Sequence, residues 1–170
     1  GDTYRLRLGR EGSVDMEIFT EETTRAAGEE DPYQAYCHCM KAVSVYEGDL
    51  LAEAPYCDWC GQTRQNLQNR YLHALGTIIA YHKKQEDLEN CIIYAEKYLS
   101  TDRTAEKMYR DLMAFYAGTG NLPQVAATLN RCREALRREL DLPVEPETEA
   151  LARRLLSREP FDSPPETAKR

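Results

Sequence analysis

Cysteines are the side chains of this 170-residue sequence with the widest range of chemistry, and the sequence contains six of them. Cys57 and Cys60 have the C-x-x-C spacing of a zinc ligand pair or of a redox pair. A four-thiolate zinc site needs a second pair. Cys37 and Cys39 serve poorly, because residues i and i+2 of a helix point about 200° apart. We therefore interpret the cysteines as reduced thiols and expect no metal or cofactor, with a zinc or redox function of Cys57 and Cys60 as the alternatives.

Acid–base and nucleophilic catalysis find little support in the remaining reactive residues. His38, His73 and His82 lie on different stretches, with no serine or cysteine nucleophile arranged beside them. No glycine loop of the kind that cradles phosphate is present. We interpret the glutamate pairs Glu21-Glu22 and Glu29-Glu30 as solvated helix ends rather than as an acid and base pair. The sequence therefore favours a protein that is not an enzyme and has no catalytic residues.

The elements that must position these side chains include two copies of one helical hairpin, between residues 71 and 140. A shift of 34 residues relates the copies, as these pairs show: Ile78-Ile79 and Leu112-Met113, Tyr81 and Phe115, Asp87-Leu88 and Asn121-Leu122, Cys91 and Val125. This is the period of a tetratricopeptide repeat (TPR). One such hairpin cannot cover its own apolar face, so neighbouring hairpins stack and share a core. We predict an all-α, TPR-like right-handed stack of about seven helices, in which Cys91 and Cys132 are buried apolar residues.

Stacked helical hairpins form a concave groove, where tyrosines can offer apolar area together with a hydroxyl group. The candidates for a partner or ligand groove are Arg64, Tyr71, Tyr81, Tyr109 and Tyr116. The alternative is that most of these tyrosines pack between helices. Arg64 is expected either to pair with a carboxylate or with the backbone near residue 48, or to be exposed.

Composition and charge exclude several functions for this chain alone. Its formal charge of −7 and mixed lysines, arginines and acids do not provide the clustered basic surface that nucleic acid or an anionic membrane requires. No apolar run approaches the roughly 20 residues of a membrane helix, and the sequence does not start with a signal-peptide pattern. We expect a soluble, cytoplasmic protein.

In chain order, alternating apolar and basic residues at 3–8 predict a short strand, and Ser13-Val14 a possible return strand. We assign residues 1–14 to the remnant or end of an upstream domain, 15–157 to the helical domain and 158–170 to a disordered tail. The expected helices run from Asp15 to about Gly28, Asp31 to Tyr46, Tyr56 to Lys84, Leu88 to Leu99, Thr104 to Ala117, Leu122 to about Glu139 and Glu147 to Ser157. Gly61 and Gly76 mark either a kink or a close helix contact in the longest of them.

Four motifs over residues 4 to 156 resemble one known family, the bacterial transcriptional activator domain of SARP-type regulators. They are Tyr4-Arg5-Leu6 with Val14-Asp15 and Phe19; Tyr46-Glu47-Gly48-Asp49-Leu50-Leu51 with Pro55-Tyr56, Trp59 and Arg64; Gly118-Thr119-Gly120-Asn121; and Leu140-Asp141-Leu142-Pro143-Val144-Glu145-Pro146-Glu147-Thr148 with Leu151. The second and fourth motifs together are the most specific. This sequence departs from the family pattern at Asp141, where glycine is more usual, and at Cys57 and Cys60.

The resemblance implies a regulatory, oligomerisation and interaction module of a bacterial transcriptional regulator. It implies self-association as a dimer, contacts with other domains of the same regulator and with RNA polymerase, and DNA binding only through an upstream winged-helix domain that this chain lacks. Whether a receiver domain precedes that domain stays open. One alternative is a domain that senses a small-molecule effector in such a regulator. Another is a free-standing TPR adaptor that binds a peptide.

Overall fold

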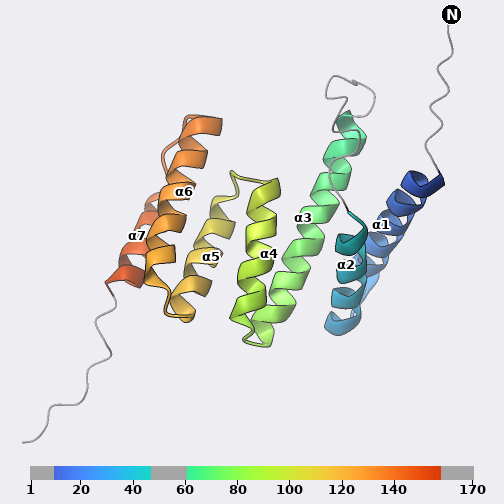
Figure 1. Ribbon diagram of the computed structural model, residues 1–170, viewed down its shortest axis with the longest axis horizontal. Helices are drawn as coiled ribbons and strands as arrows, with labels where there is room; N and C mark the ends of the chain where they lie inside the picture. Colours follow the sequence, from blue (N-terminus) through green and yellow to red (C-terminus); the bar gives the residue numbers. More distant parts are fainter. Residues whose placement is uncertain (1–9, 47–60, 158–170) are drawn as a thin grey trace, which may run out of the picture. The chain divides into compact units, whose positions relative to one another are not determined.

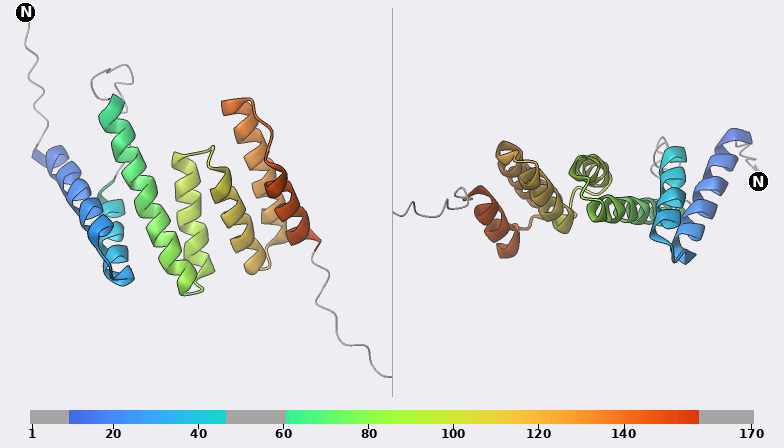
Figure 2. Two further views of the ribbon diagram at one scale, coloured as in Figure 1. Left: turned by 180° about the vertical axis from the view of Figure 1, so that it is seen from behind. Right: turned by 90° about the horizontal axis from the view of Figure 1, so that it is seen from below.

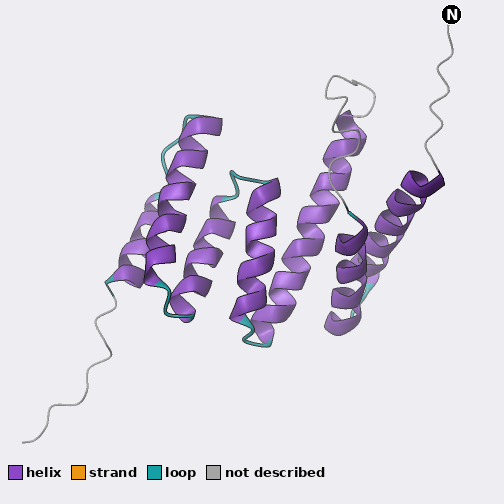
Figure 3. Cartoon of the chain, viewed as in Figure 1, coloured by secondary structure: helices purple, strands orange, loops and turns teal. Residues whose placement is uncertain are grey.

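The computed structural model describes residues 10–46 and 61–157, with side chains from Asp15 onward, and over these residues it contains seven helices and no strand (Figure 3). The helices are α1 (Arg10–Gly28), α2 (Pro32–Val45), α3 (Gly61–Lys84), α4 (Leu88–Thr101), α5 (Glu106–Gly118), α6 (Leu122–Leu140) and α7 (Pro146–Leu156). The prediction of an all-α fold with about seven helices, compatible with a TPR-like stack, is confirmed. No helix in the described ranges is long and apolar enough to cross a membrane.

The helices group into two compact units that meet in the sequence between Asp102 and Arg103. The first unit holds α1 to α4, and α2 packs against both α1 and α3 (Figure 2). Its core contains Phe19, Ala42, Leu67, Tyr71 and Leu75 as one buried cluster. A second cluster of Cys39, Ala74 and Ile78 joins α2 to α3.

The second unit holds α5, α6 and α7, and α7 packs against both other helices (Figure 1). Met113, Ala117, Val125, Leu129 and Ala152 form its buried cluster, with Tyr116, Leu151 and Leu155 packed against it. The α7 helix supplies a single small buried apolar residue to this core, Ala152, together with two half-buried leucines. The packing of α7 against α5 and α6 therefore also depends on polar contacts.

The 34-residue shift found in the sequence corresponds to equivalent helix starts. Asp87 caps α4 by accepting a hydrogen bond from Asn90 N, and Asn121 caps α6 by accepting one from Gln124 N. Each side chain satisfies a backbone donor that the first turn of a helix leaves unpaired. Cys91 and its counterpart Val125 are both fully buried, which confirms the repeat at the level of packing.

The N-terminal boundary differs from the sequence prediction. Asp15 does not cap the first helix, because α1 already begins at Arg10 and includes Ser13 and Val14. The predicted return strand at Ser13-Val14 is therefore wrong. A short strand needs a neighbouring strand to satisfy its backbone hydrogen bonds, whereas a helix satisfies its own. The strand predicted at residues 3–8, the start of the third helix at Tyr56 and the disordered tail from residue 158 lie outside the described residues.

Glycines account for two smaller results. A Cβ atom added at Gly76 or Gly61 would meet nothing within 4 Å in the described structure, so the predicted close helix contact is wrong at both positions. Gly120 has φ +77°, in the left-handed region that favours glycine. It lies in the turn between α5 and α6, directly before the capping residue Asn121.

Candidate functional site

An aromatic surface lies at one end of the first unit, where the chain turns between antiparallel helices. The connections from α1 to α2 and from α3 to α4 are at the same end, the lower one in Figure 1. Tyr33 in the first turn of α2 lies 6.1 Å from Tyr81 near the end of α3, measured between ring centroids. Tyr36 stacks on Tyr81 at 4.3 Å with an interplanar angle of 19°. We name Tyr33, Tyr36 and Tyr81 the tyrosine surface.

Tyr33 is the solvent-facing member of this surface, with 53% of its area exposed, whereas Tyr36 and Tyr81 are half-buried. The backbone N–H of Tyr33 donates to the capping carboxylate of Asp31 at 3.0 Å, which fixes the start of α2. A hydrogen bond with the Cys37 thiol raises the pKa of Tyr33, and burial raises the pKa of Tyr36. Both phenols therefore stay neutral at physiological pH and present an uncharged aromatic surface.

The buried side chain of His82 packs beneath the tyrosine surface. Its ring meets Tyr36 edge-on, at 5.4 Å and 87°, and stacks with Tyr94 of α4 at 5.7 Å and 14°. Nδ1 lies 3.1 Å from Asp87 Oδ2, and Nε2 is buried with no hydrogen-bond partner among the described residues. Hydrogen bonds from the side chain and backbone of Asn90 lower the pKa of Asp87. The carboxylate therefore stays ionised and orients the histidine, a structural role that fixes the tyrosines.

A second cluster of polar residues joins α1 to α2 around a buried carboxylate. Glu22 is 2% exposed, and its oxygens lie 2.6 Å from Lys41 Nζ, 2.6 Å from His38 Nδ1 and 3.4 Å from Arg25 Nη1. Hydrogen bonds from Lys41 first and His38 second lower its pKa, against the opposing effect of burial. The interpretation of Glu21-Glu22 as a solvated helix end is wrong for Glu22, because it is buried where α1 packs on α2 and its charge is compensated there by Lys41 of α2.

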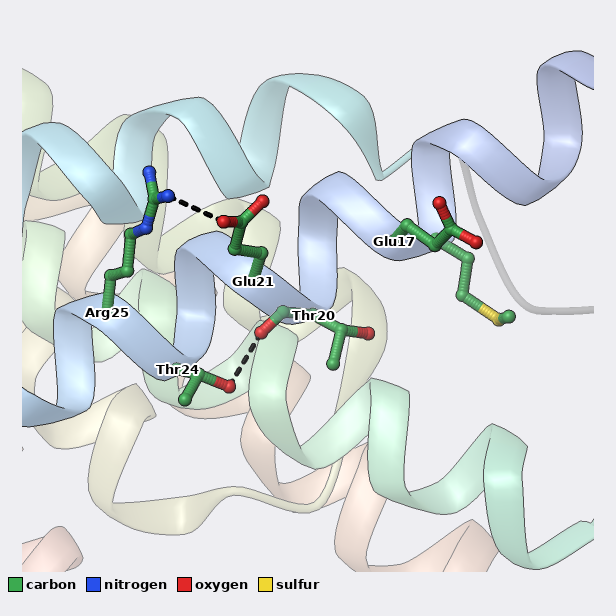
Figure 4. Close-up of a pocket in the computed structure, with 6 residues that line it drawn as sticks. Glu17, Thr20, Glu21, Thr24 and Arg25 are labelled. Carbon is green, nitrogen blue, oxygen red and sulfur yellow. Dashed lines mark hydrogen bonds and ion pairs between the residues drawn. The ribbon is translucent and has the colours of Figure 1, made fainter.

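The exposed face of α1 carries an open hollow (Figure 4). Its lining consists of side chains from two adjacent rows of that helix: Met16, Glu17, Thr20, Glu21, Thr24 and Arg25. Figure 4 shows Glu21 paired with Arg25, and the Thr24 hydroxyl donating back to the Thr20 carbonyl. Arg70 of α3 also donates to the Thr24 hydroxyl, at 3.0 Å. Because these partners already occupy most of the polar groups, the hollow offers no convergent set of groups for a ligand.

The residues predicted to line a groove have different environments in the two units. In the first unit, Tyr71 is buried and stacks on Tyr46 at 4.2 Å, whereas Tyr81 belongs to the tyrosine surface. Arg64 is half-buried at the start of α3 and has interactions with other residues. In the second unit, Tyr109 is 2% exposed and Tyr116 packs half-buried on the core. Of the five, Tyr81 alone belongs to the tyrosine surface, and the groove stays a prediction.

Tyr33 and Tyr36 are the site residues that sequence reasoning missed as a surface. Their spacing of three residues places both on one side of a helix, and Asp31-Pro32 marks its start. That signal could have identified them as neighbours. It could not have shown that Tyr81, 45 residues further along the chain, completes the surface, because this depends on how α2 and α3 pack.

Metal-ligating side chains do not converge anywhere in the ranges 10–46 and 61–157. Cys39, Cys91 and Cys132 are buried free thiols and Cys37 is partly exposed. Burial raises the pKa of Cys132 to about 12, so its thiol stays protonated. Cys57 and Cys60, the pair with metal or redox spacing, lie outside the described residues.

Polar contacts hold α7 in the second unit. Arg133 of α6 donates two hydrogen bonds to the carboxylate of Glu149, at 2.7 and 2.6 Å. Arg110 of α5 contacts Glu145 at 2.7 Å and the hydroxyl of the buried Thr148 at 2.9 Å. These contacts orient the first turn of α7, where the apolar contribution is small.

The described residues thus form helical hairpins. The charged residues described above hold helices together, and the tyrosines pack between helices or form an exposed surface. The model of one family, the bacterial transcriptional activator domain, matches residues 14–156. The chain belongs to this family and is a regulatory module of the transcriptional-activator type. Neither the curated proteins nor the solved structures contain a match to it.

Proposed function

We propose that this chain is a non-catalytic interaction module of a bacterial transcriptional regulator in the cytoplasm. In this role it self-associates as a dimer and contacts other domains of the regulator and RNA polymerase. DNA contacts belong to a separate winged-helix domain. The family match supports the regulatory role, and the surface of the helices supports the interaction role.

The observation that carries the interaction role is the exposure of large apolar side chains on both units. Those with at least two fifths of their area exposed are Tyr33, Ile93, Leu140, Leu142 and Leu156, at 40–54%. Apolar side chains in such positions are stabilised when a partner buries the area that the isolated chain leaves exposed to water. The two hollows formed by described residues, one on α1 and one at the end of α6, are open to solvent rather than enclosed, so neither favours a small-molecule sensor.

Native mass spectrometry of the purified chain under reducing conditions tests this proposal. A dimer mass without an adduct is the expected result, and a monomer at all protein concentrations would overturn self-association. An adduct of organic size would favour the effector-sensing alternative instead. One zinc ion per chain would show that the reduced-thiol interpretation of Cys57 and Cys60 is wrong.

Single substitutions then locate the dimer contact. Ile93→Lys on α4 and Leu142→Lys after α6 each place a charge where an apolar contact would be buried. We expect one of them to shift the chain to monomer while its helical circular dichroism spectrum stays unchanged. Glu134→Lys, on an exposed position of α6, is the matched control and should stay dimeric. A dimer that survives both apolar substitutions contradicts the role given to these side chains.

A further inference from the structure

We propose that the tyrosine surface binds a basic, arginine-containing segment of a partner protein. This inference rests on the proposed interaction function and deepens it by naming the chemistry of one partner. It depends on three observations: an exposed aromatic ring in contact with two other tyrosines, a group of carboxylates at the same end of the first unit, and the excess of these carboxylates over lysines there.

The geometry of the tyrosine surface suits a planar cation. Tyr33 is exposed, and its ring is held by contacts at 6.1 Å to Tyr81 and 6.3 Å to Tyr36. The stacked pair of Tyr36 and Tyr81 is in turn fixed by His82, whose own orientation depends on Asp87. A guanidinium group can stack on the exposed part of this ring, and the contacts with Tyr36 and Tyr81 reduce the ring freedom that is lost on binding.

The charges at this end of the unit complement a basic partner. The segments 28–33 and 81–89 contain six carboxylates and two lysines. The carboxylates are Glu29, Glu30, Asp31, Glu86, Asp87 and Glu89, and the lysines are Lys83 and Lys84. Both segments are the turns that Figure 1 shows at the same end of the unit. The local field is therefore negative and attracts a cationic segment.

Three of these carboxylates are available to a partner. Glu30, Glu86 and Glu89 are exposed, and none of them caps a helix. The other three already serve the fold: Asp31 and Asp87 cap helices, and Glu29 accepts a hydrogen bond from Asp31 N. A partner that meets both an aromatic ring and carboxylates favours arginine over lysine, because guanidinium stacks on rings and forms two parallel hydrogen bonds with a carboxylate.

The experiment measures fluorescence anisotropy of a labelled peptide of alternating arginine and glycine, titrated with the purified 170-residue chain at low salt. We expect binding that weakens as sodium chloride rises, and that is weaker for the matched lysine peptide. Tyr33→Ala should weaken binding about three- to ten-fold, whereas Tyr33→Phe should retain it because the ring remains. Since Tyr33 is exposed, circular dichroism should show both variants folded.

Charge variants separate a specific surface from general attraction to a chain of charge −7. Glu30→Gln should weaken binding about two- to five-fold, and the matched Glu134→Gln on α6 of the second unit should leave it unchanged. Absence of peptide binding, an unaffected Tyr33→Ala variant, or equal losses in the two glutamine variants would each overturn the inference. A dimer in native mass spectrometry without peptide binding would contradict only this inference. A monomer that binds the peptide through Tyr33 would contradict only self-association.

Discussion

Replacing the buried Glu22 with glutamine should destabilise the first unit by about 2 kcal/mol. Glutamine has nearly the same shape, so the substitution removes the charge while it preserves the packing between α1 and α2. Hydrogen bonds to charged groups contribute about 1.5–3 kcal/mol each, and loss of one partner of a fully buried pair costs about 3–5 kcal/mol. Here Lys41 and Arg25 are 60% and 53% exposed, so water compensates part of the loss.

The effect of Glu22→Gln should also depend on pH, with a sign that the lowered pKa determines. In the folded chain the pKa of the Glu22 carboxyl lies below its ordinary value of 4.5, which holds in the unfolded chain. Its contribution to stability is therefore complete above about pH 4.5, and it disappears as the pH falls through the lower native pKa. The difference in unfolding free energy between the natural chain and the variant should be largest near neutral pH and shrink in acid.

Urea unfolding followed by circular dichroism measures this difference, and hydrogen exchange of α1 and α2 peptides assigns it to the first unit. Glu21→Gln is the matched control, because Glu21 is the adjacent glutamate, is 58% exposed and pairs only along α1 with Arg25. It should cost less than about 0.5 kcal/mol. Equal losses in the two variants, or a loss that is the same at pH 7 and in acid, would refute the reasoning.

Three further predictions concern the backbone, a thiol and the closing helix. Gly76→Ala should raise the unfolding free energy by about 0.5–1 kcal/mol in a urea titration, because the added methyl group meets no described atom. Gly120→Ala should lower it by about 1 kcal/mol, because Gly120 has a positive φ. The opposite order of stabilities would contradict both arguments. Cys132 should resist iodoacetamide at pH 8 in the native chain and react after denaturation, because burial raises its pKa to about 12; native labelling in a peptide map would show that α6 opens. Arg133→Ala should lower the unfolding free energy by about 0.5–1 kcal/mol and speed hydrogen exchange in α7, since both hydrogen bonds to Glu149 are lost; unchanged exchange would mean that packing alone holds the helix.

Local sequence signals were sufficient wherever one helix turn decides the outcome. Asp31 followed by Pro32 predicted the start of α2, and the structure has both the capping hydrogen bond and proline in the first turn. The 34-residue shift predicted equivalent roles for Asp87 and Asn121, and both cap the returning helix of a hairpin. Asp141 occupies a position where glycine is more usual in the family, and it has φ 53° after the end of α6. A glycine preference there reflects that left-handed conformation.

The same signals were insufficient at α1. The residues before Asp15 suggested strand and turn, and the capping pattern at Asp15 is not unique, since an aspartate also occurs inside helices. Glu22 was interpreted as solvated for a related reason. The position of Glu22 on its helix predicts exposure or burial only when the neighbouring helix is known. Its partners Lys41 and His38 lie 19 and 16 residues further along the chain.

The sequence by itself determined the fold class, the hairpin repeat and the family, because apolar periodicity, capping residues and the closing motif are local and leave a direct pattern. Only the tertiary structure decided which side chains meet. Tyr33 and Tyr36 join Tyr81 because α2 packs against α3, and Glu22 can stay charged in the core because α2 brings Lys41 to α1. Such contacts depend on the angle at which two helices pack, and no local pattern along one helix specifies that angle.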